Sequence, residues 1–255
     1  MVDGSEAKLI RYPFASHLNE DAGSLQLAAS CDQPAGFFFE GKLAQPRRVA
    51  QLLRALMDVV QARFHIPANM LEKLLAESDP VVTAGADQLR FEGFSACCGL
   101  YVRLDLLNRA FDGPTRGRGT TNVDFNQPML SALAKVRRTQ DVELAVGRDQ
   151  FVLRQGGAEV VEKKVKLPLR WMKGFVEVQA SQRRMRHVHS MSGPQAHRFL
   201  RTLPCSVSGS RAAYMRPTKD SLRLSQTPGQ QSFSGGGLQR LRLLGRLARD
   251  AERLD

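Results

Sequence analysis

The feature that most constrains the fold is an order of elements that occurs twice along the chain. In each copy a short apolar stretch at helical spacing is followed by a strand, a Gly-x-Asp-Gln turn and two further strands. The first copy begins with a short helix at 67–74 and has its turn at 85–88. The second begins with a helix at Gln127 and has its turn at 147–150. This order predicts two helix–β-meander units whose sheets join side by side and bury one face against helices.

Two interpretations of the repeat stay open. The copies are either a true duplication or two unrelated helix–meander units. A duplication would resemble, at the level of topology alone, the units from which DNA sliding clamps are built. The segment 112–121 between the copies contains glycines and Pro114 and is typical of a loop. We therefore expect an α+β fold with a duplicated helix–β-meander core and clamp-like units.

The first two thirds of the chain give the expected core. Residues 1–24 form a polar N-terminal segment, and residues 25–167 form the α+β core. This core also contains an aromatic run at 36–41, which predicts a buried strand, and a helix that begins at Pro46. The apolar face of that helix should pack on the flanking strands.

The last third, residues 168–255, is expected to be a basic helical region. Pro168 begins a helix with an apolar face, and Ser192 is a suitable N-cap for the next helix. Residues 222–224 predict an isolated strand, and a leucine-striped basic helix follows Gly237. The chain stops soon afterwards, so we expect it to be cut out of a longer protein.

The formal net charge of +12 is concentrated near the C-terminus. Residues 161–255 contain 19 Lys and Arg against 6 Asp and Glu, whereas the first 160 residues are nearly balanced. This asymmetry favours an acidic partner, which could be nucleic acid, an anionic protein face or a membrane surface. A solvated surface that keeps the protein soluble is the alternative explanation.

Composition excludes several classes of protein. No run approaches the roughly 20 apolar residues of a membrane helix, and residues 1–7 are too polar for a signal peptide. The cysteines, Cys31, Cys97, Cys98 and Cys205, form neither a disulfide framework nor a Cys-x-x-Cys pair. We expect a cytoplasmic protein with reduced thiols and no membrane partner.

Three groups of cations are suited to contact phosphates. An Arg-Gly-Arg-Gly loop at 116–119 could bring backbone and guanidinium groups to a phosphate. Lysines at 163–166 alternate with apolar residues and should share one sheet face, and arginines gather at 183–186. If these faces merge, several phosphates are neutralised and binding falls steeply with salt. The predicted nucleic-acid-binding residues are Arg116, Arg118, Lys163, Lys164, Lys166, Arg183, Arg184 and Arg186.

Catalytic chemistry has little support in the sequence. Neither a Walker phosphate loop nor Gly-x-Gly-x-x-Gly occurs. Cys97 and Cys98 are adjacent on an expected strand, where a small apolar role is typical. The carboxylates that could act as pairs all lie in turn contexts, where Asp is common: Asp79, Asp87, Asp124 and Asp149. We predict no catalytic residue and no small-molecule substrate.

Metal binding has equally little support. His187, His189, His197 and Cys205 fall within 19 residues, and imidazole with thiolate suits zinc. His187 and His189 are the close pair, and two residues apart on a helix they would point to different sides. We predict no metal site in this chain.

Several stretches carry a resemblance to a known family. They lie at 94–101, 119–129, 165–179, 198–204 and 237–244. They resemble the N-terminal region of bacterial SWIM zinc-finger family proteins, and the resemblance covers about residues 25–250. The family's defining Cys-x-Cys and Cys-x-His motif does not occur in this sequence. The resemblance therefore implies no cofactor here, with zinc expected only in a missing C-terminal finger.

The resemblance also implies partners. Proteins of this kind are associated with MoxR-type AAA+ ATPases and von Willebrand A-domain proteins. We expect a non-enzymatic binding module that contacts DNA or RNA through its basic C-terminal third. The alternative is a protein–protein adaptor that docks the ATPase or the A-domain protein. A weaker alternative is an enzyme that uses Cys97 and Cys98 or the loop at 116–118.

Overall fold

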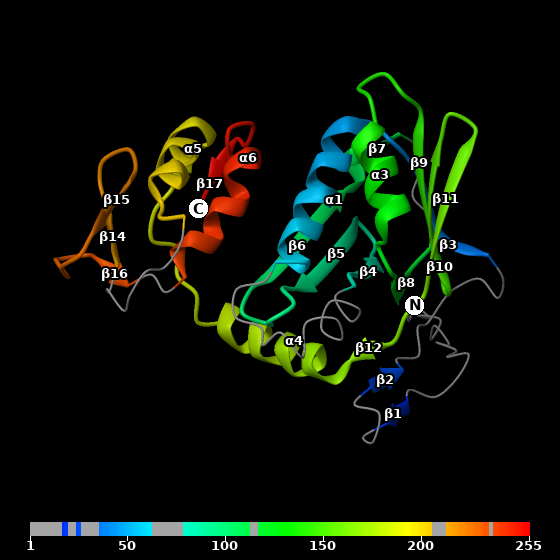
Figure 1. Ribbon diagram of the computed structural model, residues 1–255, viewed down its shortest axis with the longest axis horizontal. Helices are drawn as coiled ribbons and strands as arrows, with labels where there is room; N and C mark the ends of the chain where they lie inside the picture. The colour runs from blue at the N-terminus through cyan, green and yellow to red at the C-terminus, as the bar shows by residue number, and fades with distance from the viewer. Residues whose placement is uncertain are drawn as a thin grey trace, which may run out of the picture. The chain divides into compact units, whose positions relative to one another are not determined.

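The computed structural model describes residues 36–62, 79–112, 117–205, 213–234 and 237–255, and the backbone of two short strands at 17–19 and 24–26 (Figure 1). The helix predicted at 67–74 lies outside these residues. The chain divides into two compact units, Met1–Ala180 and Ser181–Asp255. They are unit 1 and unit 2 below, and each is described by itself. The predicted core ended at 167, whereas the helix that follows lies mostly in unit 1.

Unit 1 contains the same order of elements twice, strand–helix–strand–strand–strand. The first set is β3 (Phe37–Leu43), α1 (Pro46–Val60), β4 (Val81–Ala84), β5 (Gln88–Phe94) and β6 (Tyr101–Leu107). The second set is β8 (Gly119–Asn122), α3 (Gln127–Lys135), β9 (Val142–Gly147), β10 (Gln150–Gln155) and β11 (Ala158–Lys163). The short elements η2 (Asn108–Ala110) and β7 (Phe111–Asp112) connect them. The predicted duplicated helix–β-meander core is confirmed.

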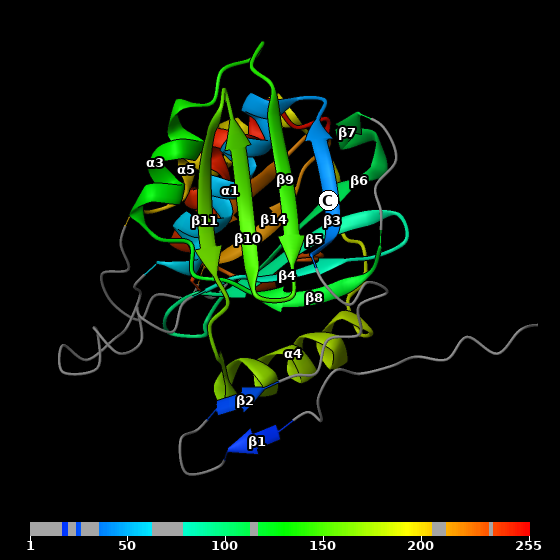
Figure 2. The same cartoon turned by 90° about the vertical axis from the view of Figure 1, so that its right-hand side faces the viewer.

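The two sets exchange their first strands. One sheet has the order β6-β5-β4-β8, and the other has the order β11-β10-β9-β3-β7. Hence β8 pairs antiparallel with β4 of the first set, and β3 pairs antiparallel with β9 of the second. Each meander is therefore completed by the other copy, which ties the two copies into one body. Figure 2 shows the second sheet facing the viewer, with α1 behind it and α3 beside β11.

Both helices lie against the sheets because each has one apolar side. In α1, Val49, Leu53, Leu56 and Val60 recur at helical spacing and are buried. Pro46 occupies the first turn of α1, where its missing N–H costs nothing. The core between helices and sheets is closed by edge-to-face aromatic rings, including Phe91 with Phe151, whose centroids lie 5.9 Å apart.

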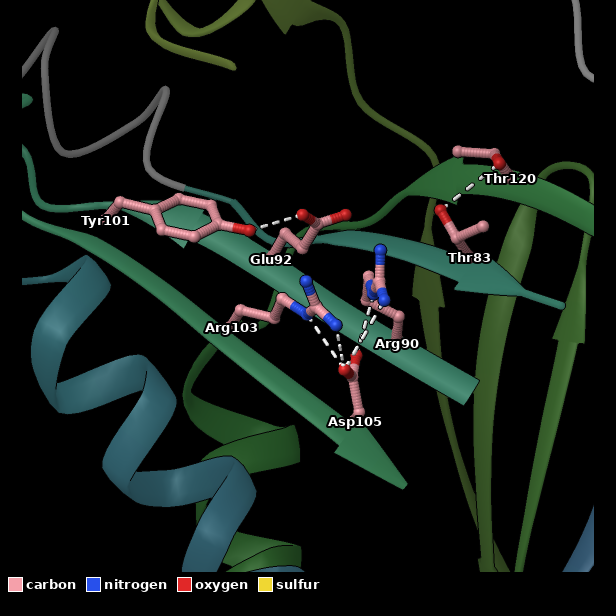
Figure 3. Close-up of polar contacts among 7 residues, drawn as sticks. All are labelled: Thr83, Arg90, Glu92, Tyr101, Arg103, Asp105 and Thr120. Atoms are coloured by element: carbon pink, nitrogen blue, oxygen red, sulfur yellow. Dashed lines mark hydrogen bonds and ion pairs between the residues drawn. The ribbon is translucent and has the colours of Figure 1, made fainter. Parts of the chain in front are cut away.

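One prediction about the repeat is corrected. In the first set α1, which the sequence indicated separately from Pro46, takes the place that α3 has in the second set, and the helix predicted at 67–74 lies outside the described residues. The expected loop 112–121 contains strand β8, whose Thr120 hydroxyl hydrogen-bonds that of Thr83 on β4 at 3.2 Å (Figure 3). Gly119 is needed because a Cβ there would lie 2.8 Å from the Phe38 ring. This glycine marks a close approach of two segments of the chain, whereas sequence reasoning interpreted it as part of a loop.

Helix α4 (Leu169–Gln182) follows the short strand β12 (Leu167–Pro168). Its Trp171 is fully buried, with its ring centroid 5.6 Å from that of Phe94. Phe175, one turn later, lies 5.0 Å from the same Phe94 ring. These contacts attach α4 to the end of β5. Strand β12 also pairs with β2 (Ser24–Gln26), which pairs with β1 (His17–Asn19).

Unit 2 contains helix α5 (Gly193–Thr202), the sheet β15-β14-β16 (Leu222–Ser225, Tyr214–Pro217, Phe233–Ser234) and the strand pair β13–β17 (Met191–Ser192, Arg253–Leu254). The predicted N-cap is confirmed: Gln195 Oε1 accepts a hydrogen bond from the Ser192 backbone N–H at 2.8 Å. The strand predicted at 222–224 is present, but it pairs with β14 and is not isolated.

The last predicted helix has a different form. Residues Leu238–Leu244 are a 3-10 helix, η3, and only Gly245–Ala248 is α-helical, α6. The leucines at 238, 241, 244 and 247 recur every three residues. A helix with three residues per turn aligns these leucines on one side, whereas an α-helix would spread them around its surface. The spacing therefore favours the tighter helix against the unit's small core. No helix among the described residues is long and apolar enough to cross a membrane.

Candidate functional site

A pocket of about 540 Å³ lies in unit 1 beside the segment that leaves β11. The predicted residues Lys163, Lys164 and Lys166 line it together. Its apolar lining comes from Val81, Val165 and Leu167. Lys163 and Lys166 are exposed, and neither forms an ion pair with another described residue. The pocket therefore has an aliphatic surface with ammonium groups at its edge.

The walls of this pocket are fixed by hydrogen bonds across three elements. The Asn122 side-chain amide donates to the Val165 carbonyl, and the Val165 N–H donates back to the Asn122 carbonyl at 3.1 Å. The Lys164 N–H donates to the Asp149 carbonyl at 2.9 Å. These bonds attach 163–167 to β8 and to the β9–β10 turn, so the lysines lie on a rigid backbone. Asp149 and Gln150 of that turn add polar groups to the lining.

The other predicted binding residues lie elsewhere. Arg116 is outside the described residues, and Arg118 is exposed just before β8. Arg183, Arg184 and Arg186 are exposed at the start of unit 2, after α4 ends. The lysines thus lie together in unit 1, and the three arginines lie together in sequence in unit 2.

Sequence reasoning noted the basic side of the last helix but did not place four exposed arginines on or beside α5 and α6 among the predicted binding residues. Arg198 and Arg201 project from α5, and Arg246 and Arg249 lie on and just after α6. The two helices pack against each other, and His197 Nδ1 lies 2.7 Å from the Gly245 carbonyl oxygen. None of the four forms an ion pair with another described residue. The sequence signal for Arg246 and Arg249 was their position beside the regularly spaced leucines of 238–247. Only the packing of α6 on α5 brings these arginines and those of α5 onto one body.

A second missed group lies on the helices of unit 1. Arg47 and Arg54 are exposed on α1, and Lys135, Arg137 and Arg138 are exposed at the end of α3. Arg47 and its neighbour at 48 occupy the first turn of α1, which contains no acid. Cations there oppose the helix dipole. A cost of this kind is a signal that could have marked Arg47, whereas the cations at the end of α3 complement the dipole of that helix.

Three carboxyl groups gather between β8, α3 and β11. Asp79 and Asp124 share a hydrogen bond, and burial together with Asp124 raises the pKa of Asp79 to about 8. Burial raises the pKa of Glu162 to about 7, although the N–H groups of Asn126 and Met129 donate to it. Glu162 is 1% exposed, and its Oε1 has no hydrogen-bond partner. The interpretation of Asp79 and Asp124 as separate turn residues is therefore wrong, because the tertiary fold brings them together.

The structure also shows where the two cysteines of the enzyme alternative lie. Cys97 and Cys98 lie in the turn between β5 and β6, not on a strand as predicted. This turn is closed by hydrogen bonds between Ser95 and Leu100, and Cys98 has a φ of +53°. Both thiols are half-buried, and Ser95 Oγ lies 3.5 Å from Cys97 Sγ. The tight hairpin connection explains the difference, since the strand ends at Phe94.

In unit 2, Ser190 Oγ lies 2.8 Å from His187 Nε2 and donates to Asp255 Oδ1 at 2.7 Å. The serine is the middle member here, whereas a nucleophilic triad needs histidine between serine and carboxylate. His187 and His189 lie in an irregular segment after α4, not on a helix as expected. Among the described residues no three His, Cys, Asp or Glu side chains form a possible metal site.

The outer face of the first sheet carries two arginines that are already paired with a carboxylate of the same sheet. Asp105 accepts hydrogen bonds from both Arg90 and Arg103, and the Tyr101 hydroxyl donates to Glu92 (Figure 3). The two guanidinium groups hold the pKa of Asp105 below its usual value despite burial. These arginines are neutralised by their own sheet, so they are poor candidates for contact with an external anion.

No family model and no curated protein matches this sequence. The chain is similar to solved sliding clamps. For the DnaN sliding clamp (DNA polymerase III subunit beta) from Pseudomonas aeruginosa bound to griselimycin, the identity is 12%, the match covers 86% of this chain and 58% of that chain, and the TM-score is 0.51. For a DNA polymerase sliding clamp from Bacillus subtilis the values are 13%, 84%, 58% and 0.53.

The Proliferating Cellular Nuclear Antigen from Entamoeba histolytica is similar at 9% identity, with 85% of this chain and 87% of that chain covered and a TM-score of 0.52. This chain thus spans 58% of the length of the two bacterial clamps. Identities this low carry information about architecture only. The comparisons show that this chain has the α+β fold of sliding clamps, built from duplicated helix–β units.

Proposed function

We propose that this chain is a non-enzymatic binding module that contacts DNA or RNA through its basic C-terminal region. The observation that carries the proposal is the charge of unit 2. Its 75 residues contain fourteen Lys and Arg against four Asp and Glu, a net charge of +10. Eight of the arginines are exposed without an ion pair to another described residue: Arg183, Arg184, Arg186, Arg198, Arg201, Arg223, Arg246 and Arg249.

Unpaired guanidinium groups on a small body are suited to phosphate. Each can donate two parallel hydrogen bonds to a phosphate, and each contact releases counterions from the nucleic acid. Few aromatic side chains accompany them: Tyr214 and Phe233 are the aromatic residues of the sheet in unit 2, and both are half-buried. Backbone contact without sequence readout is the expected mode.

The fold supports a binding role at a coarser level. The similar solved structures are sliding clamps of DNA polymerases by their names. The assignment to the SWIM family, a zinc finger beyond this chain and a cytoplasmic location are parts of the proposal that rest on the sequence resemblance and composition alone.

Fluorescence anisotropy with a labelled DNA duplex, a single strand and an RNA of equal length tests the proposal. Replacing Arg183 and Arg184 with Glu should weaken the binding of all three nucleic acids alike. Replacing Arg198 and Arg201 with Glu should do the same. With a duplex, each phosphate that the variant no longer neutralises should lower the slope of log K against log salt by about 0.9.

The matched control is Arg109→Glu with Lys173→Glu, which changes the charge equally on exposed sites of unit 1. Its affinity and salt slope should stay close to wild type. If the control weakens binding as much as the unit 2 variants, net charge alone explains the binding and the proposed surface is wrong. Absence of binding by the wild type at low salt refutes the function.

A protein–protein adaptor is the second candidate function, with a MoxR-type AAA+ ATPase or a von Willebrand A-domain protein as proposed partner. The specific observation in its favour is the lysine-lined pocket of unit 1, which lies outside unit 2. Copurification with a partner that survives nuclease treatment would support it.

A further inference from the structure

We propose that the pocket of unit 1 binds an acidic peptide segment of a partner protein, in which an aliphatic side chain lies next to carboxylates. This inference deepens the adaptor candidate and is independent of nucleic-acid binding by unit 2. It assigns Lys163 and Lys166 to a peptide, although the sequence placed them with the nucleic-acid contacts.

The volume of the pocket fits a short segment of chain. About 540 Å³ lies within the roughly 300–1,000 Å³ of ordinary ligand sites. Its aliphatic lining, from Val81, Val165 and Leu167, suits one leucine- or isoleucine-sized side chain. A purely electrostatic phosphate site would have no use for three aliphatic side chains.

The polar groups distinguish a peptide from a nucleic acid. Lys163 and Lys166 supply exposed ammonium groups that pair with single carboxylates as point charges. Asp149, in the same lining, repels a continuous polyanion but can accept hydrogen bonds from backbone N–H groups, which a peptide has and a phosphodiester chain lacks. No aromatic side chain lines the pocket, so it offers no platform for stacking a base.

The pocket is also formed in advance. The hydrogen bonds of Asn122 with Val165 and of the Lys164 N–H with the Asp149 carbonyl hold its walls without a ligand. A rigid pocket loses little conformational entropy when a peptide binds, which favours affinity from few contacts.

The probe is a fluorescein-labelled synthetic peptide with two leucines flanked by glutamates. Its binding to the full chain is followed by anisotropy and by the methyl NMR signals of Val81, Val165 and Leu167. We expect the peptide to shift these methyl signals. Lys163→Glu with Lys166→Glu should lower the affinity for the peptide roughly tenfold or more, because two attractive contacts become repulsive. A peptide with glutamine in place of glutamate should bind as weakly.

The control Arg137→Glu with Arg138→Glu makes the same change of charge on exposed sites of unit 1 outside the pocket. It should change peptide affinity less than about twofold, as expected for distant exposed charges in salt. Equal losses in the two variants, or methyl signals that do not move at saturating peptide, overturn the proposal. If a labelled oligonucleotide displaces the peptide and shifts the same methyl signals, the pocket binds phosphate instead. Loss of oligonucleotide binding in the unit 2 variants leaves this readout untouched, so the two proposals fail separately.

Discussion

Replacing Glu162 with Gln should remove a large part of the pH dependence of folding. The carboxyl group is 1% exposed, and its pKa is raised to about 7 from 4.5 in the unfolded chain, chiefly by burial. The groups that face it are the N–H groups of Asn126, which precedes α3, and of Met129 on α3, and the carboxylate of Asp124. Asp79, hydrogen-bonded to Asp124, completes the cluster.

The sign and the magnitude follow from proton linkage. Because the folded pKa lies above the unfolded one, the folded state binds a proton that the unfolded state releases between pH 4.5 and 7. Stability is therefore fully present below pH 4.5 and is lost as the pH rises to about 7. At about 1.36 kcal/mol per unit, the loss from Glu162 is at most about 3 kcal/mol. Glutamine cannot ionise, yet its carbonyl can still accept from the N–H groups of α3.

Urea unfolding between pH 4.5 and 8, followed by the fluorescence of buried Trp171, measures the effect in unit 1. The stability of Glu162→Gln relative to wild type should rise by up to about 3 kcal/mol from pH 4.5 to pH 8. The control Glu177→Gln, exposed on α4, should follow the wild type at every pH. A difference between Glu162→Gln and wild type that does not vary with pH would refute the reasoning.

Three further substitutions test the packing of the fold. Gly119→Val should destabilise unit 1 by about 2 kcal/mol or more, because its Cβ would meet the Phe38 ring at 2.8 Å; urea unfolding measures this, and an unchanged midpoint contradicts it. Trp171→Ala should cost about 3–5 kcal/mol and loosen α4; faster hydrogen exchange confined to α4 is the expected signature, and unaltered exchange there contradicts it. Gln195→Ala should destabilise unit 2 by about 1 kcal/mol by removing the acceptor of the Ser192 N–H; thermal unfolding by circular dichroism checks it, and Gln195→Glu should retain the contact.

Local patterns predicted the elements that local physics controls. The spacing of Val49, Leu53 and Leu56 predicted α1 from Pro46, and Ser192 with Gln195 marked the start of α5. The repeated Gly-x-Asp-Gln turns predicted the duplicated meanders, because such turns are set by the residues in them. The separation of a nearly neutral first part from a strongly basic end is likewise a property of composition.

The placement of the proposed binding residues was predicted in part. The alternation at 163–166 predicted that the lysines share one sheet face. In the structure β11 ends at Lys163, and the lysines instead line one pocket along the segment that follows the strand. The aliphatic lining of that pocket comes from Val81 and from Val165 and Leu167, which are distant from it in sequence. They lie together because β8 pairs with β4 and the Val165 N–H donates to the Asn122 carbonyl of β8. The arginines of α5 and α6 needed a contact between helices that no local pattern specifies.

The sequence by itself determined the helices α1, α3, α4 and α5, the Gly-x-Asp-Gln turns, the doubled meander and the sign of the charge, since each depends on residues within a few positions of one another. Only the tertiary structure decided the exchange of β3 and β8 between the copies, the close approach that requires Gly119, and the burial of Glu162 beside Asp124. These features depend on contacts between distant segments. Their free energy comes from pairing and desolvation, which no short stretch of residues encodes.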